Sequence, residues 1–322
     1  MMPALRIHRP GPLSTIQDRG RFGLQALGIP TAGAADAFSF RLGNRLLGNP
    51  DGAAAIEYWV LGPEIEAVDA PVRVALVSGG GTLTRAADGS RWTMPAWRTV
   101  TLLPGDRIAL GPTQGGAVGY ACVAGGVDVP EAMGSRSTYV RAALGGFEGR
   151  PLKTGDVVPV GVAVDPAAGN RALVTPPSDG EGPFRVLLGP QDDHFSEEAV
   201  ARFFSQPFAI SPQSDRMGKR LTGEPLTFAE GRSADITSDA MVAGAIQVPG
   251  SGEPIVMLAD RATVGGYAKI GAVIGADVSR FARLKPGQEV RFVRVSVAEA
   301  EAAARAFEDT LRDIANAAVA VE

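Results

Sequence analysis

Short apolar runs that alternate with turn-forming residues recur along the chain, and this pattern predicts a mainly β protein. In the first half, strands are expected at residues 5–9, 55–60, 72–77, 99–103, 107–110, 118–123 and 157–160. In the second half, they are expected at residues 184–188, 246–248, 255–258, 272–274 and 289–295. Turn formers such as PGD at 104–106 join several of these runs at short intervals, as a barrel or sandwich requires.

Three segments carry signals for the start of a helix. Asp36 can cap a helix that continues to Leu47, because apolar residues follow it at helical spacing. Ser196 precedes two glutamates and opens a second helix. Ser296 and Glu299 form a capping box for a helix near the C-terminus. The apolar stripe of this last helix indicates packing against a core or an interface, not a cofactor site.

A segment rich in Pro, Gly, Ala and small polar residues, 165–183, separates the two halves. We therefore expect an N-terminal β domain at residues 1–175, a similar C-terminal β domain at 184–296 and a C-terminal helix at 297–318. The turn sequence LKPGQEVRF of the second half resembles LLPGDRIAL of the first, which hints at a duplication.

Composition narrows the class of protein. Gly and Pro supply 41 and 24 of the 322 residues, about a fifth against an average near 12%, and their spacing favours turns over disorder. The formal charge of −4 and the 6% of aromatic residues, with no basic block, give no support to nucleic-acid binding. One cysteine, Cys122, allows no disulfide framework, and no signal segment or membrane span is visible. We therefore expect a cytoplasmic protein.

Several common catalytic motifs are absent from the sequence. It has no G-x-x-x-x-G-K-[ST] phosphate loop, no G-x-G-x-x-G between strand and helix, and no G-x-S-x-G elbow. With two histidines and one cysteine, no spaced His/Cys metal site can be assembled, so no metal is expected. If the protein acts on an ATP-activated substrate, another chain is expected to supply the nucleotide site.

The segment 244–270, GAIQVPGSGEPIVMLADRATVGGYAKI, carries the densest chemistry. Two apolar runs around PGSGEP predict a β-hairpin, and polar side chains set among glycines follow it directly. Tyr267 and Lys269 are two residues apart, so they share a face if the stretch is extended. A partly desolvated lysine beside a tyrosine could polarise a carbonyl or transfer a proton. A strand-end lysine in solvent explains the pattern equally well.

Polar clusters elsewhere are weaker candidates. At 9–21, a turn held by Asp18 and Arg19 is as good an explanation as a ligand site. At 134–138, a guanidinium flanked by hydroxyls could hold a carboxylate or phosphate, or form an ordinary polar turn.

Two further clusters carry carboxylates. In GPQDDHF at 189–195, adjacent carboxylates precede the helix that Ser196 opens, and capping explains at least one of them. At 214–218, Asp215 and Arg216 offer an adjacent acid and base, although surface pairs of this kind are commonplace.

Taken together, the motifs resemble the KipA / allophanate hydrolase subunit 2 family, whose bacterial members include the C subunit of the ATP-dependent 5-oxoprolinase. The matching stretches are GPLSTIQDRGRFGLQALGIPTAGAADAF, GGVDVPEAMGSRSTYVRAALGGFEGRPLKTGD, GPQDDHF, SDRMGKRL and the segment 244–270. They occur in the family's order and span residues 7 to about 295.

The resemblance implies two cyclophilin-like β-barrel domains and an activity that depends on partners. Together with a KipI-like and a LamB/YcsF-like partner protein, a chain of this family would hydrolyse the lactam of 5-oxoproline to glutamate, with ATP used by the complex and not bound by this chain alone. The same domain pair is similar to the carboxyltransferase part of biotin-dependent urea carboxylase, which makes carboxyl transfer with a separate biotin protein a second hypothesis. The chain has no visible biotinyl-lysine or biotin carboxylase segment. A third is a non-catalytic KipA-type regulator that binds a KipI-like kinase inhibitor.

The resemblance also suggests which residues form the pocket for a small amide or lactam. The catalytic candidates are Lys269, Tyr267, Asp260 and Arg216, and the substrate-binding candidates are Gln247, Thr263, Gly266, Arg136, Ser137 and Asp215. Lys269 and Arg216 would bind or polarise a carbonyl or carboxyl group. Tyr267 would donate a hydrogen bond, and Asp260 would orient the cations.

Overall fold

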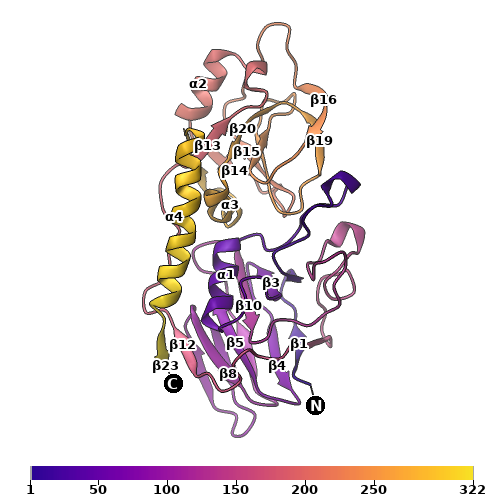
Figure 1. Ribbon diagram of the computed structural model, residues 1–322, viewed down its shortest axis with the longest axis vertical. Helices are drawn as coiled ribbons and strands as arrows, with labels where there is room; N and C mark the ends of the chain where they lie inside the picture. The colour runs from indigo at the N-terminus through magenta and orange to yellow at the C-terminus, as the bar shows by residue number, and fades with distance from the viewer. Residues whose placement is uncertain (1, 322) are drawn as a thin grey trace. The chain divides into compact units, whose positions relative to one another are not determined.

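Strands dominate the computed structural model, which describes residues 2–321 and contains four α-helices within them (Figure 1). This confirms the prediction of a mainly β protein with few helices. The chain forms two compact units. The first consists of the N-terminal residues through Arg21, Ala32–Pro177 and the residues from Thr310 onward, and the second of Phe22–Thr31 and Ser178–Asp309.

The first unit contains two antiparallel sheets. The six-stranded sheet has the order β11 (Val157–Pro159), β1 (Ala4–Arg9), β4 (Glu64–Val68), β9 (Arg107–Leu110), β6 (Gly81–Thr84) and β7 (Arg91–Met94). The seven-stranded sheet has the order β2 (Ser14–Gln17), β3 (Ala55–Trp59), β10 (Val118–Val123), β5 (Val72–Val77), β8 (Arg98–Leu102), β12 (Asn170–Ala172) and β23 (Val319–Val321).

One apolar core joins the two sheets of the first unit. Leu5 and Ile65 of the six-stranded sheet and Val74 and Leu76 of the seven-stranded sheet are fully buried in the same cluster. Helix α1 (Ala37–Leu46) contacts β5 and β10 of the seven-stranded sheet. Close packing there depends on Gly43, because a Cβ at this position would lie 2.5 Å from Val77 and 2.7 Å from the Cys122 sulfur. A short 3₁₀ helix, η2 (Val140–Ala142), belongs to the loop after β10.

The second unit is built on an eight-stranded sheet. Its order is β21 (Glu289–Val290), β14 (Phe208–Ile210), β15 (Gly218–Thr222), β18 (Ile255–Met257), β17 (Ala245–Gln247), β20 (Lys269–Val273), β13 (Phe184–Leu188) and β22 (Phe292–Arg294). A separate antiparallel ribbon consists of β16 (Asp235–Ala240) and β19 (Val264–Tyr267), which lie side by side in Figure 1. The helical elements are η1 (Gln25–Leu27), η3 (Asp192–His194), α2 (Glu197–Ser205) and α3 (Gly275–Ala282).

Aromatic side chains fill much of the core of the second unit. The ring of Phe203 on α2 stacks on that of Phe292 on β22, with centroids 4.7 Å apart. Phe184 on β13 and Phe281 on α3 meet edge to face at 5.0 Å. These contacts fix both helices against the sheet, since offset and edge-to-face aromatic pairs add to the gain from burial.

The three predicted helix caps are present. The Asp36 carboxylate accepts from the amide of Ser39 at 3.1 Å, and the Ser196 hydroxyl accepts from that of Ala199 at 3.1 Å. At the last helix, α4 (Val297–Asn316, yellow in Figure 1), the Ser296 amide donates to the Glu299 carboxylate at 2.7 Å. Helix α4 ends before the predicted residue 318, because β23 follows at once and pairs with β12.

The predicted strands are present with end points that differ by at most one residue, with two exceptions. The strand predicted at 289–295 is interrupted at Arg291 and forms β21 and β22. The strand predicted at 272–274 begins earlier, at Lys269. Several short strands, among them β2, β4, β6, β15, β16 and β19, were not predicted, nor was α3. No helix within residues 2–321 is long and apolar enough to cross a membrane.

Candidate functional site

The predicted hairpin in the segment 244–270 is confirmed. Strands β17 and β18 pair antiparallel, with Ile246 opposite Val256 and Gln247 opposite Ile255. The turn between them is closed by a hydrogen bond from the Gly252 amide to the Pro249 carbonyl at 2.8 Å. The polar stretch that follows is not a simple loop, because it contains β19 and the start of β20.

A β-bulge occurs where β20 passes Gln247. Ile246 pairs with Gly271, but the next residue, Gln247, pairs with Lys269, so β20 carries one extra residue, Ile270. Bulges of this kind change the direction in which the neighbouring side chains point, and they are common beside functional sites.

The expectation that Tyr267 and Lys269 share a face is wrong. Tyr267 is 42% exposed and Lys269 is 3% exposed. The reason is that Tyr267 ends β19 of the two-stranded ribbon, whereas Lys269 begins β20 of the eight-stranded sheet. The backbone changes sheets between them at the buried Ala268.

The Lys269 ammonium is buried beside a carboxylate that the sequence analysis did not select. Lys269 Nζ lies 3.0 Å from Asp239 Oδ2, and its side chain is 4% exposed whereas that of Asp239 is 48% exposed. The hydrogen bond from Lys269 lowers the pKa of the Asp239 carboxyl. The pair therefore places a positive charge just below the surface of the β16–β19 ribbon.

Gln191 holds the backbone at Lys269. Its backbone amide donates to the Lys269 carbonyl at 3.1 Å, and its side-chain oxygen accepts from the Lys269 backbone amide at 3.2 Å. Its side-chain nitrogen also lies 3.5 Å from Asp239 Oδ2. Gln191 belongs to the GPQDDHF motif, in which the sequence analysis considered the carboxylates and not the amide.

Gln247 and the two glycines of β19 lie next to Tyr267. Gln247 Nε2 donates to the Tyr267 carbonyl at 3.4 Å. A Cβ at Gly265 would lie 2.3 Å from Gln247 Nε2, so only glycine lets this amide approach. At Gly266 the nearest atoms to an added Cβ are 3.7 Å away, which leaves room there. Thr263 is half-buried, and its carbonyl accepts from the Met241 amide at 3.0 Å.

Arg216 and Asp260 form a buried ion pair. Arg216 Nε and Nη2 each donate to one oxygen of Asp260, both at 2.9 Å, and the Asp260 amide donates to the Arg216 carbonyl at 2.9 Å. The two side chains are 8% and 10% exposed. Asp215, the neighbour of Arg216, accepts instead from the amides of Met217 and Gly218 and so shapes the turn before β15.

Arg136 and Ser137 belong to the first unit, while the other eight predicted site residues belong to the second. The Arg136 guanidinium pairs with Glu131 at 2.6 Å and with Asp128 at 3.2 Å. Its donors are thus engaged by carboxylates of its own loop, as in the polar-turn interpretation.

Asp18 joins two motifs that the sequence analysis treated separately. Its carboxylate accepts from the hydroxyls of Ser135 and Ser137 and from the amide of Arg136. It also accepts from the Gly20 amide at 2.7 Å. Because four donors converge on one carboxylate, the segments 9–21 and 134–138 form one braced structure, and Ser137 is fully buried in it.

Lys219 on β15 is a second buried lysine that the sequence analysis missed. It is 2% exposed, and its Nζ donates to the Leu284 carbonyl at 2.8 Å. Burial lowers the pKa of Lys219 to about 8. The signal in the sequence was weak, because GKRLT reads as an ordinary exposed strand with two cations.

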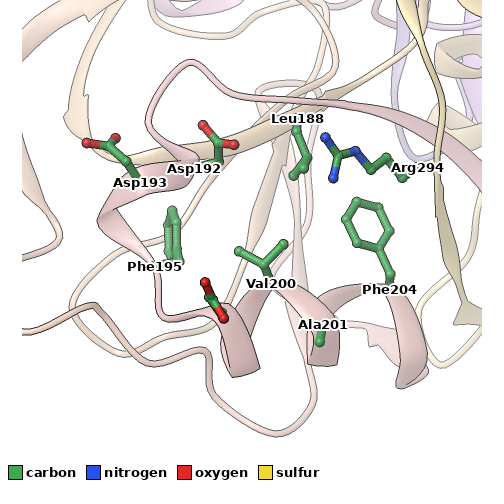
Figure 2. Close-up of a pocket in the computed structure, with 9 residues that line it drawn as sticks. Leu188, Asp192, Asp193, Phe195, Val200, Ala201, Phe204 and Arg294 are labelled. Carbon is green, nitrogen blue, oxygen red and sulfur yellow. The ribbon is translucent and has the colours of Figure 1, made fainter.

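A hollow of about 500 Å³ opens on the second unit beside η3 and α2. Figure 2 shows Leu188, Val200 and Phe204 among its apolar walls, with Asp192 and Arg294 among its charged groups. None of the ten predicted site residues is among those that line this hollow. Across residues 2–321, no cluster of three or more His, Cys, Asp or Glu side chains could hold a metal ion.

Comparison with known families gives one match over most of the chain. The family model described as "Carboxyltransferase domain, subdomain A and B" matches residues 27–294. Among curated proteins, the C subunit of 5-oxoprolinase from Escherichia coli is 37% identical over 299 residues, which cover 92% of this chain and 93% of that protein. Urea amidolyase of Lachancea kluyveri is 33% identical over 315 residues, which cover 91% of this chain but 17% of that protein.

Solved structures of related proteins have the same fold over almost the whole chain. The urea amidolyase of Kluyveromyces lactis superposes with a TM-score of 0.84 at 27% identity, over 98% of this chain and 20% of that one. The urea carboxylase of the same organism gives a TM-score of 0.83 at 27% identity, over 98% of this chain and 29% of that one. The chain therefore spans less than a third of the length of each of these two proteins.

Proposed function

Because the chain belongs to the family of carboxyltransferase domains with subdomains A and B, we propose that it is the C subunit of an ATP-dependent 5-oxoprolinase. The observation that carries this proposal is the match to the E. coli protein of that name, which extends over 92% of this chain and 93% of that protein. We propose a KipI-like protein and a LamB/YcsF-like protein as the other two components of the complex, and a cytoplasmic location where ATP is available.

The surroundings of Lys269 suit a planar amide. A lactam and urea share an N–C=O group, whose oxygen accepts hydrogen bonds and whose nitrogen donates them. The Lys269 ammonium would polarise the carbonyl oxygen, and the exposed Tyr267 hydroxyl would donate a second hydrogen bond. The side chain of Gln247 has a donor and an acceptor that could bind the N–H group of the substrate. The space at Gly266 would allow the substrate to approach the backbone.

Lys269 is held by Asp239, so substrate binding would require an exchange of partners. The Asp239 carboxylate is half-exposed and lies on the two-stranded ribbon, while the lysine is anchored in the main sheet. We propose that the substrate carbonyl or carboxylate takes the place of Asp239 at the ammonium.

The other predicted residues would act around this centre or in their own unit. We propose that Asp260 orients Arg216 through the bidentate pair, so that Arg216 supplies a fixed positive charge for the substrate carboxyl group. Thr263 and Asp215 would shape the backbone of the pocket, while Arg136 and Ser137 would brace their loop in the first unit. ATP would supply the driving force for opening a stable lactam at another component of the complex, since the sequence has no phosphate loop.

The test is to co-purify the chain with its KipI-like and LamB/YcsF-like partners and to measure ATP-dependent release of glutamate from 5-oxoproline. The Lys269→Ala variant should form the same complex with turnover reduced by about 100-fold or more, the usual effect of losing a key electrostatic group. Lys285→Ala, which removes an exposed lysine of the same unit, should leave turnover unchanged. Unchanged turnover in Lys269→Ala would contradict the assignment of this lysine.

Carboxyl transfer is the second candidate, and the 33% identity to a urea amidolyase favours it. In that case the activity of the assembled system would require a biotin protein and would be blocked by avidin, while 5-oxoproline would not be consumed. Complex formation with the KipI-like partner and no turnover of either substrate would instead favour a regulatory role.

A further inference from the structure

The first unit contains a cavity of about 240 Å³ that the proposed function does not use. All of its walls come from that unit, mainly from the N-terminus, from β5 and β8, and from the segment 160–168. Most of the side chains that line it are apolar and small, such as Pro3, Val160 and Ala163. Its size lies below the roughly 300 Å³ at which pockets for drug-sized ligands begin, so a ligand would be small.

One charged side chain, Arg73 of β5, lines this cavity. Arg73 is 8% exposed as a whole residue, so most of its side chain is buried. Within residues 2–321 it forms no ion pair, and its acceptors are three backbone carbonyls, those of Ala168, Asp165 and Leu47. A guanidinium has five N–H donors and can never give up its charge, so three neutral acceptors leave this charge without a counter-charge.

A buried charge without a counter-charge is unfavourable unless something supplies one. Leu47 is the C-cap of α1, so its carbonyl contributes only the partial negative charge of a helix C-terminus, at a distance of 3.4 Å. The nearby Asp165 offers its carbonyl to Arg73, while its carboxylate accepts from the Ala167 amide. The positive charge at the cavity wall therefore has no carboxylate of the described chain to meet it.

We propose that this cavity binds a small monocarboxylate with an apolar body, whose carboxylate meets the Arg73 guanidinium. The apolar walls exclude a highly charged ligand such as a polyphosphate, for which a single cation would be insufficient. The forked donors of arginine match the two oxygens of a carboxylate. The site would be a ligand site of the first unit, independent of the reaction proposed for the second.

Binding of a carboxylate in this cavity can be tested on the whole protein by titration calorimetry with hexanoate and hexanamide. The two compounds have similar shapes, but only hexanoate is charged. Hexanoate should bind with a dissociation constant on the order of 1 mM, and hexanamide at least about tenfold more weakly, because the neutral amide forms no charge-assisted pair. Arg73→Gln should remove the preference for the anion. Equal binding of both compounds, or no saturable binding of hexanoate, would overturn the proposal and leave Arg73 as a strap for the segment 165–168.

A second variant that keeps Arg73 is needed, because Arg73→Gln removes the contacts of this side chain with three carbonyls as well as the proposed contact with the ligand. Ala163→Phe should fill the cavity and weaken hexanoate binding by at least about tenfold. Val164→Phe is the matched control, since Val164 is 71% exposed and is not among the residues that line the cavity. It should bind hexanoate like the unaltered protein. If Ala163→Phe binds hexanoate as well as Val164→Phe does, the ligand does not occupy this cavity and the proposal is wrong.

Discussion

The Arg216–Asp260 pair offers the sharpest test of how the second unit is held together. The change Asp260→Asn keeps the shape of the side chain but removes its charge, and it leaves a guanidinium that is 8% exposed without its carboxylate. Removing one partner of a buried pair costs about 3–5 kcal/mol, because the remaining charge stays desolvated. Asparagine can still accept one of the two hydrogen bonds, so we expect the lower end, about 3 kcal/mol.

The assay must report on the second unit specifically. The three tryptophans, Trp59, Trp92 and Trp97, all belong to the first unit, so tryptophan fluorescence would follow the wrong part of the chain. Hydrogen exchange of peptides from β15 and β18, measured in increasing urea, reports the free energy of unfolding where the pair lies.

Two comparisons separate the buried pair from an ordinary one. Asp193→Asn breaks the pair of Asp193 with Arg232, which is shorter, at 2.7 Å, but has side chains that are 61% and 48% exposed. This change should cost less than about 1 kcal/mol. The double variant Arg216→Met with Asp260→Leu should recover stability to within about 1 kcal/mol of the original, since no charge remains buried. If Asp260→Asn costs no more than Asp193→Asn, the pair does not behave as buried, and our reasoning about Arg216 fails.

Two further predictions concern a second lysine and the glycines of β19. Burial lowers the pKa of Lys219 to about 8, below the value near 10.4 of an unfolded chain, so the unfolded chain binds more protons between these values and stability rises with pH there. From pH 7 to pH 10.5, the unfolding free energy of the unaltered protein should rise by on the order of 2–3 kcal/mol more than that of Lys219→Met, which has no group that titrates at this position. If the difference between the two proteins is the same at pH 7 and at pH 10.5, the burial argument is wrong. Gly265→Ala should cost about 1–3 kcal/mol by crowding Gln247, whereas Gly266→Ala should stay within about 0.5 kcal/mol, as thermal unfolding can check.

Local patterns predicted the regular parts of this fold because their physical causes are local. The cap at Ser196 and the capping box at Ser296 depend on residues three positions apart, and both are present. The strands Val72–Val77 and Val118–Val123 were predicted with the observed bounds, since their apolar runs are buried on both faces. Strands such as β16 (DITSDA), which is mostly exposed, carry no apolar alternation and could not be recognised in this way.

The contacts of the candidate site depended on pairings that no local pattern contains. Asp239 reaches Lys269 across 30 residues because the β16–β19 ribbon returns beside β20. Likewise, Asp18 meets Ser135 and Ser137 at a separation of more than 100 residues. The motifs identified the segments that carry these polar side chains, but which carboxylate pairs with which cation is set by the order of the strands in the sheets.

Tyr267 and Lys269 show why the two-residue period of a strand is not sufficient to predict which side chains share a face. A period of two places alternate residues on one face only while the strand stays in one sheet and in one register. Here the chain leaves the ribbon after Tyr267, and the bulge at Ile270 shifts β20 against Gln247 by one residue. Both events turn the lysine inward and leave the tyrosine exposed, so that a buried cation and an exposed hydroxyl come to stand two residues apart. Under the proposed function, a substrate carbonyl would therefore meet the ammonium only in the place that Asp239 now occupies.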